Sequence, residues 1–191
     1  MKVLAINASP RPNGNTAVML KTVLKEAEAA GMETELVQLG GNRVSGCRAC
    51  MACQKMQNGR CAIDDDIINS IIAKMLDADA IILGSPTYFA DVTTEMKALI
   101  DRAGYACRSM GRPLARKVGA AVSVHRRGGA VCSYDTMNHF LLITGMIVPG
   151  STYWNFAAAR NIGEAEKDSE ALANMKDLGQ NIVWLLQKIH N

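Results

Sequence analysis

The chain has 191 residues, 49% of them hydrophobic, and its 21 basic and 18 acidic residues give a net charge of +3. This length and apolar content suit one well-buried domain, residues 1–191. The basic residues are scattered except for one adjacent pair, so a nucleic-acid-binding stripe is not expected. No apolar run approaches the roughly 18 residues of a membrane span or forms a secretion signal. We therefore expect a cytoplasmic protein that acts on small molecules.

A strand, a polar loop and a helix are predicted at the start of the chain. Val3 to Ile6 reads as a buried strand, and apolar residues recur at helical spacing from Thr16 to Ala27. The loop between them delivers short polar side chains to a helix N-terminus, where free N–H groups and the helix dipole favour a phosphate. An ordinary capped loop is the alternative. The predicted phosphate contacts are Ser9, Arg11, Asn13, Gly14, Asn15 and Thr16.

Two common nucleotide motifs are absent from the sequence. Neither G-x-x-x-x-G-K-[ST] nor G-x-G-x-x-G follows any predicted strand. We therefore expect a ligand other than ATP or a Rossmann-bound dinucleotide.

A long segment rich in cysteine follows the second predicted strand, residues 34–39. Residues 40–65, called the cysteine loop below, show no periodicity and are too long for a simple connection. The loop contains Cys47, Cys50, Cys53 and Cys61, four of the six cysteines. In a protein without a secretion signal, cysteines are expected as reduced thiols, metal ligands or redox groups rather than as disulfides. A loop of this length and composition indicates a functional insertion.

Three aspartates, residues 64–66, precede an amphipathic helix predicted over residues 67–76. Carboxylates in the first turn of a helix match its dipole and can cap it, and this is the interpretation that we favour. A carboxylate metal site is the alternative.

A second polar loop follows the short apolar strand predicted at residues 80–83. Its glycine and proline predict a sharp turn, its hydroxyls can bond the edge of a planar heterocycle, and its aromatic rings can lie against that heterocycle. A plain turn whose aromatic rings pack on the core is the alternative. The next helix is predicted over residues 93–104, ended by Gly104, with Cys107 beyond it as a packed or free thiol. The predicted ring contacts are Ser85, Pro86, Thr87, Tyr88 and Phe89.

A third loop follows the strand predicted at residues 118–124. Arg126 and Arg127 can stabilise negative charge on a reduced ring, Gly128 permits close backbone approach, and two solvated arginines are the alternative. A helix over residues 130–144, with Cys132 as buried filler, and a fifth strand at residues 146–148 are predicted next.

The last part of the chain is predicted to hold a further contact region and a core helix. Residues 153–155, Tyr-Trp-Asn, are the candidate contacts. The apolar stripe of the final helix, from Leu172 to Ile189, indicates core rather than a site.

Alternating strands and helices predict an α/β fold with a three-layer, doubly wound, five-stranded parallel sheet. Ligands bind such sheets at the carboxyl ends of the strands, where the three polar loops emerge. The pattern fits a mononucleotide, with its phosphate on the first loop and its planar ring between the other two.

Three features together resemble the flavodoxin-like NAD(P)H-dependent FMN reductases, and in particular their iron–sulfur flavoprotein branch. They are Ser9-Pro10-Arg11 with Gly14-Asn15-Thr16, the run from Gly84 to Phe89, and the cysteine loop. The resemblance implies strand order 2-1-3-4-5, bound FMN, NAD(P)H as electron donor, and a homodimer or homotetramer with the flavin near a subunit interface. The Ser9-Pro10-Arg11 start of the first loop differs from true flavodoxins, whose phosphate loop is rich in threonine.

The expected function is an FMN-dependent oxidoreductase that passes electrons from NAD(P)H to a small acceptor or an iron–sulfur centre. A non-enzymatic electron-transfer protein is the alternative. No catalytic side chain is expected, because the flavin carries the chemistry and the protein positions and tunes it.

The cysteine spacing C-x2-C-x2-C-x7-C predicts a [4Fe–4S] cluster on Cys47, Cys50, Cys53 and Cys61. A structural zinc site more often pairs two separated C-x2-C units, and zinc or reduced thiols are the alternatives. Basic residues of the same loop can offset the negative charge of the four thiolates, namely Arg48, Lys55 and Arg60.

Overall fold

The protein contains one parallel sheet of five strands in the order β2-β1-β3-β4-β5. The computed structural model describes residues 1–190. The predicted fold class and strand order are confirmed. The strands are β1 (Lys2–Asn7), β2 (Glu33–Gln38), β3 (Ala80–Pro86), β4 (Val118–His125) and β5 (Phe156–Ala158).

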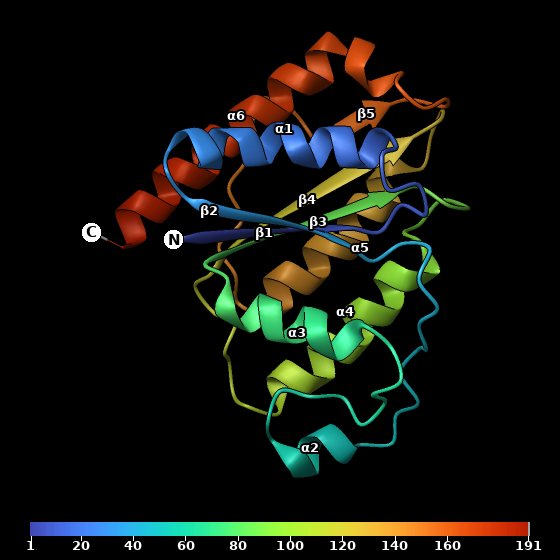
Figure 1. Ribbon diagram of the computed structural model, residues 1–191, viewed down its shortest axis with the longest axis vertical. Coiled ribbons are helices and arrows are strands. Elements are labelled where there is room, and N and C mark those ends of the chain that lie inside the picture. Colours follow the sequence, from blue (N-terminus) through green and yellow to red (C-terminus); the bar gives the residue numbers. More distant parts are fainter. Residues whose placement is uncertain (191) are drawn as a thin grey trace.

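Helices cover both faces of the sheet (Figure 1). One layer holds α1 (Asn15–Ala29) and α6 (Ser169–Ile189), and the other holds α3 (Ile68–Asp77), α4 (Thr94–Arg108) and α5 (Ala130–Ile143). The five-residue helix α2 (Ala52–Met56) belongs to the cysteine loop and lies beyond α4, at the far end of the second layer. A short 3₁₀ turn (Ala165–Lys167) precedes α6.

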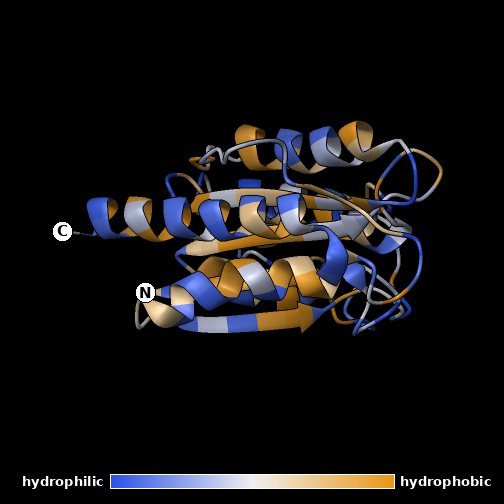
Figure 2. Ribbon diagram, turned by 90° about the horizontal axis from the view of Figure 1, so that it is seen from above, coloured by the Kyte–Doolittle hydropathy of each residue, from blue (hydrophilic) through white to orange (hydrophobic). Residues whose placement is uncertain are grey.

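The central strands are apolar on both sides, as a parallel sheet covered by two helix layers requires. Leu4 and Ile6 of β1 pack in the cluster beneath α3 and α4, whereas Val3 and Ala5 pack in the cluster beneath α1 and α6. All four are fully buried. In Figure 2, α1 and α6 lie side by side over the sheet, and hydrophilic turns alternate with hydrophobic ones along both. Within residues 1–190, no helix is long and apolar enough to cross a membrane.

The fifth strand differs from the prediction. Residues 146–148 do not form it: Ile147 makes only an isolated bridge to Val118, and Pro149-Gly150 then turns the chain away from the sheet. The chain returns at Phe156, which pairs with Ser123 near the carboxyl end of β4. The apolar run at residues 146–148 resembles a strand in sequence, and Ile147 lies beside the first residue of β4. The run does not continue along β4, so it forms no strand.

Two further expectations about the helices are corrected. Helix α4 passes through Gly104 and ends only at Arg108, because the glycine faces Phe140 of α5 without disturbing the helix. Cys107 therefore lies inside α4, where burial raises the pKa of its thiol to about 11. Cys132 is exposed on α5 rather than buried, because that part of the helix faces away from the sheet.

Candidate functional site

The loops after β1, β3 and β4 meet at one end of the sheet, where the carboxyl ends of the parallel strands lie (Figure 1). We call residues 9–16, 84–89 and 125–129 the three-loop edge. Backbone hydrogen bonds join its parts: the Ala8 N–H donates to the Gly84 carbonyl at 2.8 Å, and the Thr87 N–H donates to the Val124 carbonyl at 2.8 Å. The sheet itself therefore holds these loops together.

The first loop leaves the N-terminus of α1 open. Gly14 supplies no side-chain cap to α1, so N–H groups of the first turn remain available to an anion. Ser9 and Thr16 are buried beneath the loop, and the Ser9 hydroxyl accepts a hydrogen bond from the Arg11 N–H at 3.2 Å. Arg11 and Asn13 are exposed beside this terminus. These groups lie around the helix terminus at which the sequence predicts a phosphate, and the site stays a prediction.

The Asn15 side chain has a structural partner that sequence reasoning missed. Its Nδ2 donates to the Asn161 carbonyl at 2.8 Å, and its Oδ1 accepts from the N–H groups of Gly163 and Ala165 at 3.1 and 3.3 Å. These contacts join the start of α1 to the segment after β5, about 146 to 150 positions away in the chain. The backbone of Asn15, rather than its side chain, is therefore the part free to face a ligand.

The second loop divides into a buried and an exposed part. Ser85 is fully buried: its hydroxyl donates to the Pro86 carbonyl at 2.9 Å and accepts from the Thr93 N–H at 3.1 Å, so it shapes the turn. The Thr87 hydroxyl accepts a hydrogen bond from Ser133 of α5 at 3.1 Å. The outer part carries the aromatic rings of Tyr88 and Phe89, both exposed.

The tip of the second loop has a strained backbone. Tyr88 and Asp91 exchange both of their backbone hydrogen bonds, and the two residues between them, Phe89 and Ala90, have φ values of +47° and +67°. Residues other than glycine, asparagine and aspartate rarely adopt this left-handed backbone conformation. The turn holds the Phe89 ring fully in solvent at the three-loop edge, instead of packing it on the core.

The third loop places two exposed arginines at the same edge. Arg126 and Arg127 follow β4, and Gly128 has open space around it. Gly129 begins α5 with a φ of +84°. His125, at the base of the loop, is half-buried, and burial lowers the pKa of its imidazole. It therefore adds no fixed positive charge to the arginine pair at neutral pH.

The four cysteines of the cysteine loop line one small cavity, although 14 positions separate the first from the last. Cys53 is buried on α2, Cys61 is half-buried, and Cys47 and Cys50 are exposed at the rim. The Ala49 N–H donates to the Cys47 sulfur at 3.4 Å. The loop folds back through left-handed residues at Ala49, Met51 and Gln57.

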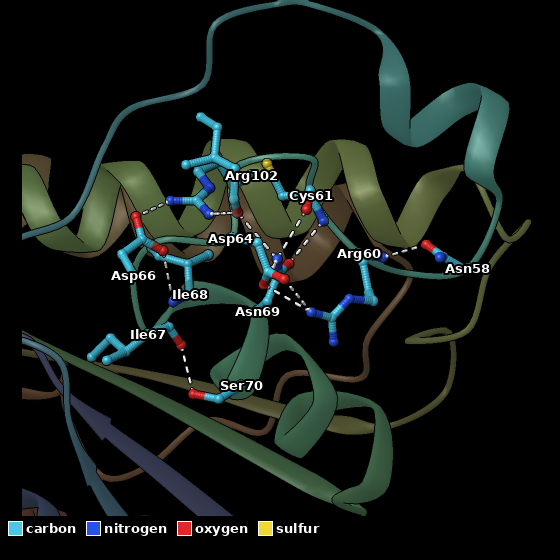
Figure 3. A network of polar contacts seen from close by, with 11 residues as sticks. Asn58, Arg60, Cys61, Asp64, Asp66, Ile67, Ile68, Asn69, Ser70 and Arg102 are labelled. Carbon is cyan, nitrogen blue, oxygen red and sulfur yellow. Dashed lines mark hydrogen bonds and ion pairs between the residues drawn. The ribbon is translucent and has the colours of Figure 1, made fainter.

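Side chains from α3 and α4 fix the second half of the cysteine loop (Figure 3). The buried amide of Asn69 accepts from the Cys61 N–H at 2.8 Å and donates to the carbonyls of Cys61 and Ile63 at 2.9 and 3.1 Å. Arg102 donates to the carbonyl of Ile63 at 2.7 Å and to the Asp66 carboxylate at 2.5 Å. These contacts explain why a segment without periodicity adopts one conformation.

The aspartates before α3 are hydrogen-bond and ion-pair partners rather than the predicted cap. The N-cap residue of α3 is Ile67, which makes no side-chain cap, and the first turn holds no acidic residue. Asp66, one position earlier, accepts a hydrogen bond from the Ile68 N–H at 3.1 Å. Asp64 pairs with the exposed Arg60 at 2.8 Å. Hydrogen bonds from Asn69 and Arg60 lower the pKa of Asp64.

Four cysteines can bind either a single zinc ion or an iron–sulfur cluster. In residues 1–190, no three histidine, cysteine or acidic side chains converge closely enough to hold a single metal ion. A zinc ion requires its sulfur ligands about 2.3 Å from one point. A [4Fe–4S] cluster is held by four cysteine thiolates. The four cysteines that line the cavity match such a cluster in the number and type of its ligands.

The chain is similar in sequence to known flavoproteins. The family model for NADPH-dependent FMN reductases matches residues 1–161. An iron-sulfur flavoprotein of Methanocaldococcus jannaschii is 35% identical over 99% of both chains. One of Methanosarcina thermophila is 35% identical over 99% of this chain and 97% of its own.

Among solved structures, that of RosB with a bound 8-demethyl-8-formylriboflavin-5'-phosphate superposes with a TM-score of 0.77. The two chains are 18% identical, and the match covers 100% of this chain and 80% of that one. At this identity the likeness supports the fold.

Proposed function

Because this chain belongs to the NADPH-dependent FMN reductase family, we propose that it passes electrons from NAD(P)H through FMN to a [4Fe–4S] cluster or a small acceptor. The observation that carries the finer part of this proposal is the single cavity lined by all four cysteines of the cysteine loop. The family supports the FMN and the reductase chemistry, and the cavity supports the cluster.

The three-loop edge supplies what an FMN site needs. FMN, when bound, supplies the exchange of hydride and single electrons. The protein contributes the open terminus of α1 for the phosphate, with Thr16 beneath it and Arg11 beside it. Arg126 and Arg127 place positive charge at the end of the edge where the ring is expected. Phe89 and Tyr88 offer exposed aromatic faces.

The cysteine loop supplies four thiolates and a donor to one of them. Cys47, Cys50, Cys53 and Cys61 are the proposed ligands, and a cluster on them would supply a one-electron site. The Ala49 N–H already donates to the Cys47 sulfur, and such bonds stabilise thiolate charge in iron–sulfur proteins. The exposed Cys47 and Cys50 leave a side of the cavity open to an incoming group.

Anaerobic expression followed by iron and sulfide analysis tests the cluster. About four irons and four sulfides per chain are expected in the parent protein, and clearly fewer in Cys50→Ser. Cys132→Ser is the matched control, because Cys132 is exposed on α5 outside the loop and should leave the iron content unchanged. Reconstituted protein that contains flavin but no iron would remove the cluster and leave the FMN reductase.

Steady-state oxidation of NADPH and NADH with added FMN tests the route of the electrons. The parent is expected to oxidise at least one of them with a small acceptor such as a quinone. If Cys50→Ser keeps this rate but no longer reduces a one-electron acceptor, the cluster lies on the path to that acceptor. An equal rate with both acceptors would place the cluster off the path.

We also propose that the chain forms a homodimer or homotetramer. Tyr153 and Trp154 are 60% and 55% exposed, and their tilted rings lie side by side at a centroid distance of 5.1 Å, which is an unusual use of two large rings on a monomer surface. A groove of about 850 Å³ between α2, α4 and α5 adds further exposed apolar surface. Analytical ultracentrifugation should show species larger than 20.6 kDa at micromolar concentration. Finding only the monomer would contradict the proposal.

A further inference from the structure

Arg102 of α4 lines the same cavity as the four cysteines, yet it lies far from them in the sequence. Its side chain is completely buried. Arginine is almost never buried to this degree unless its charge is paired. The position of this cation beside four thiols therefore calls for an explanation.

The guanidinium of Arg102 is paired on one side and free on another. Nη1 donates to the Asp66 carboxylate at 2.5 Å and to the Ser45 carbonyl at 3.0 Å, and Nη2 donates to the Ile63 carbonyl at 2.7 Å. The buried Nε has no hydrogen-bond partner among the described residues. A buried N–H that lacks a partner is costly, so this donor stands out among the buried polar groups of the protein.

Cys61 is the cysteine that Arg102 influences most directly. Both residues line the cavity, and Arg102 donates to the Ile63 carbonyl, two positions after Cys61, at 2.7 Å. Figure 3 shows the Cys61 sulfur beside the Arg102 side chain, opposite the Asp66 carboxylate. The cation thus lies between a carboxylate and a cysteine of the cavity.

The other basic residues near the cavity are weaker sources of charge. Arg48, Lys55 and Arg60 are exposed, and Arg60 is already paired with Asp64. Solvent and salt screen exposed charges, whereas a buried charge acts through a medium of lower dielectric constant. Arg102 is therefore the cation whose charge reaches the cavity with least screening.

We propose that Arg102 positions the cysteine loop and also raises the reduction potential of the cluster that the loop holds, with Asp66 acting in the opposite sense. The inference rests on the proposed function, because it concerns the same four cysteines. Adding one electron makes the cluster more negative, so a buried cation at its edge stabilises the reduced form. A buried carboxylate behind that cation weakens the effect.

A redox titration of the anaerobically prepared full chain, monitored by electron paramagnetic resonance with dithionite as reductant, tests this proposal. Arg102→Met should lower the midpoint potential and Asp66→Asn should raise it, each by at least a tenfold change in the reduction equilibrium, or about 59 mV for one electron. Arg102→Lys, which keeps the charge, should stay near the parent value. If Arg102 and Asp66 only held the cysteine loop in place, Arg102→Met and Asp66→Asn would shift the midpoint potential in the same direction, because each variant loosens the loop.

Iron content is measured first in every variant, which separates the two proposals. A parent chain without a cluster would overturn the proposed function and this inference with it. A parent with a cluster whose potential is unchanged or lowered in Asp66→Asn would overturn the inference alone. Asp66→Asn removes the charge and one of the two acceptor oxygens but keeps an oxygen that can accept from Arg102, so the test stands even if Arg102→Met does not fold.

Discussion

The three-loop edge and the cysteine loop are held in place by different parts of the chain. At the three-loop edge, the backbone of the sheet fixes the loops, as in the 2.8 Å bond from Ala8 to Gly84. At the cysteine loop, two buried side chains from neighbouring helices, Asn69 and Arg102, do the same work. A site built from backbone tolerates the loss of a side chain, whereas a loop held by two side chains does not. Substitutions should therefore affect ligand binding at the first region and stability at the second.

The largest effect is expected at the buried ion pair. Arg102→Met should lower the free energy of unfolding by about 3–5 kcal/mol, because it leaves the Asp66 carboxylate buried without its partner. Arg60→Met is the matched control in the same loop: its pair with Asp64 is exposed, and its loss should leave the free energy of unfolding close to that of the parent. Urea denaturation followed by circular dichroism measures both. Equal losses in the two variants would contradict the comparison.

The next effect concerns the open terminus of α1. Thr16→Val should weaken FMN binding by about 1.5–3 kcal/mol, or roughly tenfold to a hundredfold, because a hydrogen bond to a charged phosphate is lost. Thr22→Val is the control on the same helix, where the hydroxyl bonds only to the Val18 carbonyl at 2.9 Å. Fluorescence titration of FMN measures both. Unchanged affinity in both Thr16→Val and Arg11→Ala would rule out this phosphate site.

A substitution that forces two backbone segments apart should affect the three-loop edge, even though the backbone holds this region together. A Cβ added at Gly40 would lie 2.3 Å from the Ala8 carbonyl oxygen and from the Ser9 carbonyl carbon, which are both backbone atoms of the phosphate loop. Gly40→Ala should therefore lower the free energy of unfolding by about 1–3 kcal/mol and weaken FMN binding as well. Gly46→Ala meets no atom within 4 Å and should stay within about 0.5 kcal/mol of the parent. A neutral Gly40→Ala would show that the two segments can separate.

The smallest effect is the pH dependence of the same ion pair. Burial tends to raise the pKa of Asp66, but its hydrogen bonds, led by that from Arg102, hold the pKa below 3.8. The stability that this carboxylate contributes is fully present above that value and is lost as the pH falls through the lower folded pKa. The gap in unfolding free energy between the parent and Asp66→Asn should therefore narrow below about pH 4, by at most ~1.4 kcal/mol per pH unit.

Urea titrations between pH 7 and pH 3 follow this gap. Asp65→Asn, a change at an exposed position one residue earlier, is the control and should show little gap at any pH. A gap between the parent and Asp66→Asn that stays constant down to pH 3 would contradict the assignment.

The sequence predicted the sheet and its edge because apolar runs and polar loops alternate clearly up to β4. It misplaced β5 because Phe156-Ala157-Ala158 carries only one large apolar side chain, whereas the run at residues 146–148 looks more like a strand. Local sequence patterns cannot show which of these two runs pairs with β4 as a strand.

The support of the cysteine loop could not be read from the sequence. Arg102 lies in an amphipathic helix, where a basic residue normally indicates the exposed face. Arg102 is buried because the cysteine loop, which comes earlier in the chain, packs over α4. The role of Asn15 was missed for the same reason, since its partners lie beyond residue 160. Contacts of this range depend on the folded topology and leave no local signal.

The shortness of β5 also bears on how copies of the protein can associate. With three residues, it is one border strand of the sheet, and the other, β2, carries Glu33 and Glu35. Brief or charged border strands offer few free backbone groups to a foreign strand, and natural proteins use both devices against aggregation. Two copies therefore have little reason to join by continuing one sheet. Any stable assembly of this protein is expected to bury helix faces and loops instead.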